Sequence, residues 1–326
     1  MFDALILNQE EKRTISTIEQ LDESLLPEGE VLIAVDYSSL NYKDGLAITG
    51  KGKIVRNFPM VPGIDLAGQV LSSDDPRYQE GDSVVLTGWG VGENHWGGMA
   101  QRARLKADWL VPLPQGFNSK QAMMVGTAGF TAMLCVQTLI DAGIKPEDGP
   151  ILVTGASGGV GSVAVTLLSE LSYKVAAITG RMEQNGPLLE KLGASQIIDR
   201  SEFEEPARPL EKQIWAGAVD TVGNKVLAKV LSQMDYNGAV AACGLAGGFN
   251  LPTTVMPFIL RNIRLQGVDS VNCPREKRIT AWEKIAELLP AHYFEQACTE
   301  IALNEAPQYA EKITNGQITG RVVIKL

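Results

Sequence analysis

Three glycines, Gly155, Gly158 and Gly161, lie in the run ILVTGASGGVGS at residues 151–162, which begins with a short apolar stretch. Glycines at this spacing let a chain turn sharply, bring its backbone N–H groups close to a pyrophosphate and pack the next helix near its strand. The N-terminus of that helix adds a partial positive charge for phosphate groups. Because an expected strand precedes the glycines and an expected helix follows them, the run predicts a dinucleotide-binding turn.

The residues after the next expected strand indicate which dinucleotide this turn accepts. That strand ends at Thr179, and Gly180 and Arg181 follow it. NAD sites usually carry an Asp or Glu here for the ribose 2′-hydroxyl, whereas a 2′-phosphate needs small hydroxyl residues and an arginine. No carboxylate is present and Arg181 could pair with a phosphate, so the sequence favours NADPH over NADH. The alternative for Arg181 is a solvated surface cation. Arg200, after a further strand, is expected on the adenine side.

The elements that must position these residues form two domains. Strands and helices alternate over residues 126–266, which predicts a doubly wound parallel sheet of the Rossmann type. Residues 1–125 contain short strand-like runs separated by Gly and Pro, which is typical of a β-rich, barrel-like domain. Residues 267–326 return to helices and end in a strand that is expected to close back onto the first domain. The predicted fold class is therefore α/β.

Composition excludes several classes of protein. The net charge of −9 argues against a general nucleic-acid surface, which needs clustered Lys and Arg. The N-terminal residues lack the basic flank and cleavage site of a secretory signal. The longest apolar helix is expected near residues 126–144 and contains Gln137 and Asp141, so it is predicted to be a buried or interface helix and not a membrane span. A cytoplasmic protein is expected.

A metal site and a disulfide framework are both disfavoured by the Cys and His residues. No Cys-x-x-Cys pair occurs, and the chain has only two histidines, so a zinc site of the usual type has too few ligands close in sequence. The cysteines are instead expected to act as small buried apolar side chains. These scattered residues are Cys135, Cys243, Cys273 and Cys298, with His95 and His292.

Several longer runs resemble one enzyme superfamily across the whole chain. They are NYKD at residues 41–44, TGKGK at 49–53, PGIDLAG at 62–68, GWGVGENHWGG at 88–98 and GTAGFTA at 126–132. Together with the glycine-rich turn, they resemble the medium-chain dehydrogenases/reductases. Within that superfamily, they are similar to the acrylyl-CoA reductase family of the zinc-free, quinone-oxidoreductase-like branch. This resemblance implies that the β-rich domain is GroES-like and binds the substrate.

The resemblance also implies a reaction without a metal. Zinc alcohol dehydrogenases of this superfamily have a Cys near residues 41–42 and a His within residues 63–65, and neither is present here. Without a Lewis acid, nothing would stabilise an alkoxide, which disfavours alcohol oxidation. The implied reaction is the NADPH-dependent reduction of acrylyl-CoA to propanoyl-CoA, with hydride added at the β-carbon and a proton at the α-carbon. The thioester carbonyl can accept the developing charge.

Residues 41–44 are the candidate catalytic residues. Tyr42 could lie against the nicotinamide or donate a proton, Asp44 could orient a neighbour or relay a proton through water, and Asn41 is expected in the same cleft. The alternatives are a packed structural tyrosine and water as the acid. By the resemblance, the residues around NADPH are Tyr42, Ser157, Gly158, Gly159, Val160, Thr179, Gly180, Arg181, Arg200, Leu245, Ile259, Ser270 and Asn315.

Other sequence features leave alternatives open. Lys51, Lys53 and Arg56 form a basic run that is either a solvated face or an attraction for the phosphates of CoA. His95 is either a hydrogen-bonded structural residue or part of a pocket. The rival functions are a reductase of quinones or 2-alkenals and a non-catalytic NADPH-binding sensor. The apolar residues 256–261 are a candidate edge for a homodimer, and no nucleic-acid or membrane partner is expected.

Overall fold

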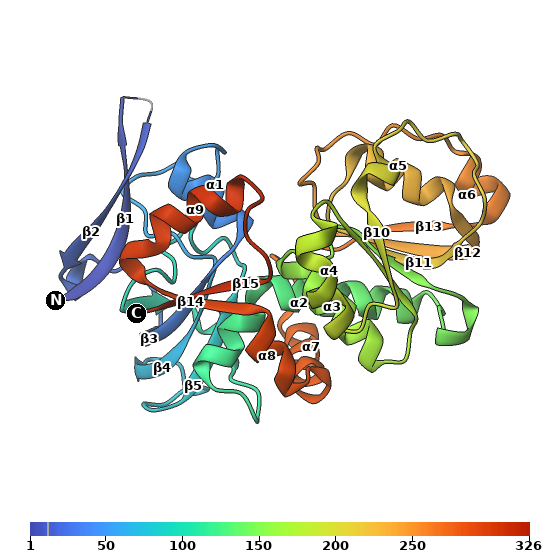
Figure 1. Ribbon diagram of the computed structural model, residues 1–326. Coiled ribbons are helices and arrows are strands. Elements are labelled where there is room, and N and C mark those ends of the chain that lie inside the picture. Colours follow the sequence, from blue (N-terminus) through green and yellow to red (C-terminus); the bar gives the residue numbers. More distant parts are fainter. Residues whose placement is uncertain (12) are drawn as a thin grey trace. The chain divides into compact units, whose positions relative to one another are not determined.

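The chain folds into two units, which the computed structural model describes for residues 1–11 and 13–326 (Figure 1). The β-rich unit consists of Met1–Thr127, Ser270–Ala286 and Cys298–Leu326. The parallel-sheet unit consists of Ala128–Asp269 and Glu287–Ala297. Residues 287–297 thus pack with the parallel-sheet unit, while residues 270–286 and 298–326 pack with the β-rich unit.

The β-rich unit is built on a seven-stranded sheet and a separate hairpin. In the sheet, β15 is antiparallel to β3, as are β4 and β6, whereas β14 and β15 are parallel. In β3, Val31, Ile33 and Val35 are buried while the residues between them are partly exposed, which is the two-residue period of a strand. The strands are β1 (Phe2–Glu10) and β2 (Arg13–Leu21) in the hairpin, then β3 (Val31–Leu40), β4 (Asp65–Ser73), β5 (Ser83–Thr87), β6 (Arg102–Leu105), β7 (Leu110–Pro112), β14 (Cys298–Ala302) and β15 (Arg321–Lys325).

Two helices of this unit, α1 (Tyr42–Thr49) and α9 (Ala306–Thr314), pack against each other (Figure 1). Gly45 permits the approach, because a Cβ at this position would contact the Ile313 side chain at 2.5 Å. Beneath them, Ala47 and Ile48 join a buried cluster with residues of β1 and β15. Helix α7 (Arg275–Leu288) and the 3-10 turns η1 (Glu23–Leu25), η2 (Ala107–Trp109) and η5 (Leu303–Glu305) complete the unit.

The parallel-sheet unit has six strands in the order β10-β9-β8-β11-β12-β13. The order reverses between β8 and β11, and ligands of such sheets bind beyond the carboxyl ends of the strands at this reversal. The predicted doubly wound parallel sheet is confirmed. The strands are β8 (Ile151–Val153), β9 (Val175–Thr179), β10 (Gln196–Asp199), β11 (Trp215–Asp220), β12 (Met234–Ala242) and β13 (Arg264–Gly267). The helices are α3 (Gly159–Glu170), α4 (Met182–Lys191), α5 (Asn224–Ser232), α6 (Met256–Arg261) and α8 (Ala291–Gln296), with the turns η3 (Pro146–Asp148) and η4 (Arg200–Phe203).

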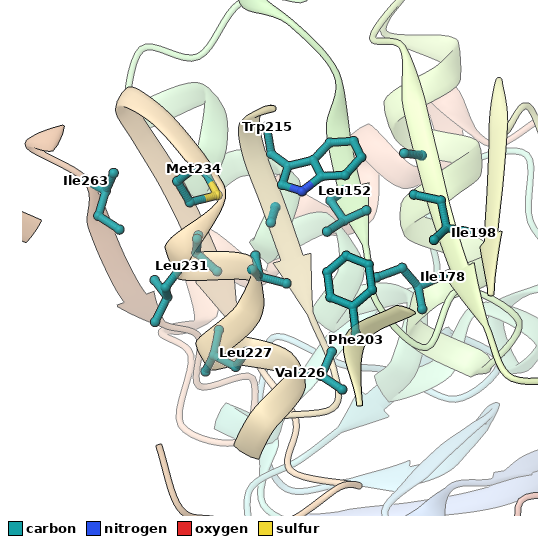
Figure 2. Close-up of a cluster of buried hydrophobic side chains, with 14 residues drawn as sticks. Leu152, Ile178, Ile198, Phe203, Trp215, Val226, Leu227, Leu231, Met234 and Ile263 are labelled. Atoms are coloured by element: carbon teal, nitrogen blue, oxygen red, sulfur yellow. The ribbon is translucent and has the colours of Figure 1, made fainter. Parts of the chain in front are cut away.

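A cluster of apolar side chains covers one face of this sheet (Figure 2). Figure 2 shows Leu152 and Ile178 of the central strands near Phe203 of η4, with Val226 and Leu227 of α5 on the same side. Strands β8 and β9 are buried along their whole length, as expected for parallel strands covered on both faces. Each large apolar side chain in such a core contributes about 1.5–3 kcal/mol relative to exposure.

Helix α2 (Ser119–Asp141) begins earlier than predicted and contains a break. Gly126 has φ 54° and ψ −159°, so the chain makes one helical segment before it and another after it. By length and composition α2 resembles a membrane span, yet 72% of its most apolar window is buried within the protein. The prediction of a buried helix is confirmed, while its expected start at residue 126 is the position of the break.

Candidate functional site

The glycine-rich turn between β8 and α3 requires glycine at two positions. Gly155 has φ 59°, in the left-handed region, and a Cβ there would clash with the hydroxyl of Thr221. A Cβ on Gly161 would clash with the carbonyl oxygen of Gly155. Only a chain without side chains at these positions lets the helix begin so close to the strand, as the sequence predicts.

The N-terminus of α3 is built to receive an anion. Gly158 is the N-cap residue, and it has no side chain that could satisfy the first N–H groups of the helix. The N–H groups of Gly159 and Val160 follow in the first turn, where the helix dipole favours negative charge. A pyrophosphate fits this arrangement, because its oxygens would accept the N–H hydrogen bonds that a side-chain cap accepts in other helices.

The end of β9 lies beside this turn, so the two predicted parts of the cofactor site come together. The hydroxyls of Ser157 and Thr179 share a hydrogen bond of 3.3 Å. Thr179 Oγ1 also accepts hydrogen bonds from the Arg181 backbone N–H at 3.3 Å and from Asn185 Nδ2 at 3.2 Å. Asn185 is buried, and the sequence did not predict its role. A single Asn within an amphipathic helix belongs to no recognisable motif.

Arg200 lies close to Gly180. A Cβ on Gly180 would be 3.0 Å from Arg200 Cζ, so a larger residue at 180 would push this guanidinium away. The Arg200 Nε lies 3.4 Å from Glu204 Oε1, and the Arg200 side chain is 56% exposed. The nearby Asp199 accepts from the Ser201 N–H at 2.8 Å, and hydrogen bonds to Ser201 lower the pKa of this carboxyl. The end of β9 thus carries Thr179, has the Arg200 guanidinium beside Gly180, and is followed in the chain by Arg181, a set of residue types that suits a ribose 2′-phosphate.

A buried aspartate that the sequence analysis did not select supports the turn from the next strand. Asp220 ends β11; its Oδ1 accepts from Thr154 Oγ1 at 2.7 Å and its Oδ2 from the Gly223 N–H at 2.8 Å. Thr221 Oγ1 donates to the Thr154 carbonyl at 2.9 Å. Burial raises the pKa of Asp220, while these hydrogen bonds oppose the rise. The signal in the sequence is an Asp that ends an apolar strand one position before a threonine.

In the β-rich unit, the candidate catalytic residues lie at the start of α1. Asn41 is its N-cap and Tyr42 its first residue. Asn41 and Asp44 are 7% and 1% exposed, whereas Tyr42 is 44% exposed. Only the tyrosine of this group therefore presents much of its side chain to solvent.

Asp44 uses both carboxyl oxygens to hold backbone. Its Oδ1 accepts from the N–H groups of Gly63 at 3.1 Å and Ile64 at 3.0 Å, and its Oδ2 accepts from the Asn41 N–H at 2.9 Å. Burial, together with the charge of Asp65, raises the pKa of Asp44 to about 7, although the hydrogen bonds from Asn41 and Ile64 favour its charged form. The carboxyl group thus ties the first turn of α1 to the segment before β4.

Asp65 and Arg321 are fully buried next to this group and were not selected as site residues from the sequence. Ser39 lies between them: its hydroxyl donates to Asp65 Oδ1 at 2.7 Å and accepts from Arg321 Nη2 at 2.6 Å. Asn41 bridges them a second time, since its Nδ2 donates to Asp65 Oδ2 at 3.0 Å and its Oδ1 accepts from Arg321 Nη1 at 3.1 Å. We refer to Ser39, Asn41, Asp44, Asp65 and Arg321 as the buried polar network.

The backbone on both sides of the break in α2 is hydrogen-bonded to this network. Asp65 Oδ2 accepts from the Thr127 N–H at 2.8 Å, and Arg321 Nε donates to the Met124 carbonyl at 3.2 Å. A Cβ on Gly126 would lie 2.6 Å from Arg321 Nη2 and 2.7 Å from Asp65 Oδ2. The backbone groups released by the break are therefore satisfied by two buried charges, and only glycine leaves room for them.

The glycine-rich loop at residues 88–98 is anchored at both ends within the β-rich unit. Trp89 has φ 58°, and its N–H donates to the Val271 carbonyl at 3.1 Å. Glu93 accepts from Lys43 Nζ of α1 at 2.8 Å. His95 Nδ1 lies 2.9 Å from the Trp96 carbonyl, and its ring packs edge-on against Trp109. These contacts favour the structural alternative for His95.

Arg278 is a further buried cation that the sequence analysis missed. Its Nη1 donates to the Thr87 carbonyl at 2.7 Å, and its Nη2 donates to the Ser270 carbonyl at 3.1 Å. Ser270 is thereby fixed beside Gly88, where a Cβ would lie 3.2 Å from the Ser270 carbonyl oxygen. The guanidinium of Arg278 also lies over the ring of Trp89, 5.0 Å from its centroid.

The remaining predicted cofactor residues, Leu245, Ile259 and Asn315, are exposed. Leu245 and Ile259 are 64% and 72% exposed, after β12 and in α6. Asn315 is the exposed C-cap of α9. Their contacts with a cofactor stay predictions. Within residues 1–11 and 13–326, no three or more His, Cys, Asp or Glu side chains lie together as ligands for a metal ion.

The comparisons with known proteins agree with this geometry. Residues 27–115 match the alcohol dehydrogenase GroES-like domain family, and residues 159–288 match the zinc-binding dehydrogenase family. The chain is 63% identical over 323 residues to the probable acrylyl-CoA reductase AcuI of Escherichia coli, covering 99% of each chain. It is 54% identical over 327 residues to the acrylyl-CoA reductase AcuI of Ruegeria pomeroyi, again covering 99% of each. The crystal structure of E. coli K-12 YhdH with bound NADPH has a TM-score of 0.97 at 63% identity, covering 99% of both chains.

Replacing Arg181 with alanine is predicted to discriminate between the two nicotinamide cofactors. If Arg181 pairs with the 2′-phosphate, Arg181→Ala weakens NADPH binding by about 1–3 kcal/mol and leaves NADH binding nearly unchanged. Titration of each cofactor against tryptophan fluorescence measures both dissociation constants. Arg208→Ala, at an exposed arginine of the same unit, is the control. Equal losses for both cofactors would remove Arg181 from this role.

Asp44→Asn is predicted to flatten the pH dependence of stability. Because the pKa of Asp44 rises from 3.8 to about 7 on folding, the folded state binds more protons than the unfolded state in this window. The free energy of unfolding of the native sequence therefore falls as pH rises from about 4 to about 7, by at most about 4 kcal/mol. Urea unfolding across this range measures the slope. Asp74→Asn, at an exposed carboxylate, is the control, and an unchanged slope in Asp44→Asn contradicts the assignment.

Proposed function

Because the chain belongs to the acrylyl-CoA reductase family of the zinc-free, quinone-oxidoreductase-like medium-chain dehydrogenases/reductases, we propose that it reduces acrylyl-CoA to propanoyl-CoA with NADPH. The observation that supports this most directly is its full-length similarity to the two AcuI reductases. The cofactor is NADPH, in keeping with the arginines at the end of β9 and with the NADPH-bound relative. The enzyme is an oxidoreductase that acts on an activated carbon–carbon double bond.

This reaction requires the protein to position the cofactor and the substrate, and it requires no protein nucleophile. Bound NADPH supplies a hydride for the β-carbon, and a proton must reach the α-carbon. The conjugated thioester carbonyl accepts the negative charge that develops between these events. The protein's part is to orient the double bond, polarise the carbonyl oxygen and exclude competing water reactions.

We assign different roles to the three residues at the start of α1. Tyr42 is the proposed catalytic residue, because its phenol is the most exposed side chain of the group and can reach a bound substrate. Asn41 and Asp44 are proposed as positioning residues, since their polar atoms hold the buried network and the first turn of α1. The carboxyl group of Asp44 already accepts three backbone hydrogen bonds. To relay a proton, Asp44 would also have to donate one towards the substrate, so we do not assign it this role.

The parallel-sheet unit is the proposed NADPH domain, and the β-rich unit is the proposed substrate domain. Residues 157–160 would bind the pyrophosphate through backbone N–H groups, while Thr179, Arg181 and Arg200 would surround the 2′-phosphate and adenosine. The more distant contacts proposed for the cofactor are those of Leu245, Ile259, Ser270 and Asn315.

We also propose a homodimer in the cytoplasm. Strand β13 is the edge of the parallel sheet, so its outer hydrogen-bonding groups could pair with a second copy. Next to it in sequence, α6 and the preceding segment expose apolar side chains, among them Phe249 at 85% and Val255 at 66%. The four cysteines, all present as free thiols, are compatible with a reducing compartment.

A substrate panel tests the proposed function. Oxidation of NADPH, followed by its absorbance, should be fastest with acrylyl-CoA when crotonyl-CoA, a simple quinone and a 2-alkenal are offered at matched concentrations. The same series with NADH should be slower throughout. A preference for the quinone or the alkenal would support the first rival function, and NADPH binding without turnover would support a sensor.

Tyr42→Phe tests proton donation while preserving the ring. Loss of a general acid typically lowers turnover by about 10²–10⁴-fold, so kcat should fall by an amount in this range with little change in NADPH affinity. Single-turnover kinetics in light and heavy water show whether proton transfer limits the variant. Tyr236→Phe, at a tyrosine that is 64% exposed in the other unit, is the control. Unchanged turnover with rate-limiting hydride transfer would identify water as the acid.

A further inference from the structure

The segment that follows α1 presents two exposed basic side chains, Lys53 and Arg56. Gly50 ends the helix with φ 67°, and residues 51–58 continue along the β-rich unit. Ile54, Val55 and Phe58 are partly buried and pack against the same apolar cluster as Ala47 and Ile48. Lys53 and Arg56 alternate with these anchors and are exposed. The apolar residues thus fix the segment, and the two basic side chains face solvent.

The charge of this segment is unusual for the chain. Residues 45–64 contain Lys51, Lys53 and Arg56 but no Asp or Glu, although the net charge of the chain is −9. Lys51 is neutralised locally, because its Nζ lies 2.6 Å from Glu311 Oε2 and 3.1 Å from Thr314 Oγ1 of α9. Throughout the part of the chain that the structure describes, Lys53 and Arg56 make no such ion pair. Two exposed cations three residues apart attract a multiply charged anion.

The position of these cations along α1 suits one part of the proposed substrate. Tyr42 begins the helix and Lys53 lies just beyond its other end. A helix of eight residues is about 12 Å long. In a CoA thioester, the long pantetheine arm likewise separates the reacting acyl group from the pyrophosphate and the 3′-phosphate. An acyl group at the Tyr42 end of the helix would thus leave the phosphates within reach of the basic side chains.

We propose that Lys53 and Arg56 bind the phosphate groups of the CoA portion of the substrate and thereby select CoA thioesters over smaller enones. This inference rests on the proposed function, since it assigns a role at the same substrate site. Arg56 can form two parallel hydrogen bonds with a phosphate, and Lys53 adds a point charge. Lys51 stays with Glu311 and serves to hold the segment against α9.

The double variant Lys53→Gln/Arg56→Gln tests the proposal by a comparison of thioesters. For acrylyl-CoA, KM should rise about 10-fold or more while kcat changes less than about 2-fold, because the lost contacts are remote from the reacting bond. For the acrylyl thioester of N-acetylcysteamine, which has no phosphate, KM should be the same in both proteins. The acrylyl thioester of dephospho-CoA shows how much of the effect belongs to the 3′-phosphate. Lys277→Gln, at an exposed lysine of the same unit, is the matched control.

A direct measurement of free CoA binding tests the proposed phosphate contacts without relying on turnover. Calorimetric titration should show that CoA binds the native sequence more tightly than the double variant, with a difference that shrinks as salt is added. Equal affinity for CoA, or an equal rise in KM for the phosphate-free thioester, overturns the proposal. If the native sequence binds CoA through these residues but turns over neither thioester, the proposed reaction fails and the CoA site stands.

Discussion

The β-rich unit depends on the pairing of Asp65 with Arg321 through the hydroxyl of Ser39 and the amide of Asn41. Both charged side chains are buried, so each would be strongly destabilising if the hydrogen bonds that hold it were lost. Through this pairing, the ends of β3, β4 and β15 meet the start of α1 and the break in α2. A single polar arrangement therefore joins five elements, which come from residues 39–44, 65, 124–127 and 321 of the chain.

Both units use a buried carboxylate to shape backbone near a proposed site while leaving the contacting groups free. In the β-rich unit, Asp44 holds the first turn of α1, and Tyr42 projects from that turn. In the parallel-sheet unit, Asp220 holds Thr154, the residue just before the glycine-rich turn. We propose that the protein contacts its ligands through a phenol, backbone N–H groups and surface cations. These groups need no large rearrangement to bind.

The parts of the site that were predictable have signals that are local in sequence. The turn at residues 155–161 and the strand end at residues 179–181 each depend on neighbours a few residues away, so their spacing was enough to predict the local backbone, while their contacts with NADPH stay predictions. Arg321 acts on Ser39 across 282 residues, and nothing near it distinguishes it from a surface arginine. Gly126 marked a helix in the sequence, but its left-handed backbone is stabilised by Asp65 and Arg321, which lie on distant strands. Likewise, residues 287–297 join the parallel-sheet unit through contacts such as Tyr293 with Ser162, which local patterns do not reveal.

The distance in sequence between Ser39 and Arg321 also sets an order of events during synthesis on the ribosome. At roughly 5–20 residues per second, the chain grows for tens of seconds after Ser39 before Arg321 is made. For that time β3 lacks its neighbour β15, and Ser39 and Asn41 lack the Arg321 guanidinium that they bind in the folded protein. Residues 128–269 are complete 52 residues before Arg321 is made, so the parallel-sheet unit can begin to fold first. The nascent protein then carries an open strand edge that invites chaperones or aggregation until the last strand is added.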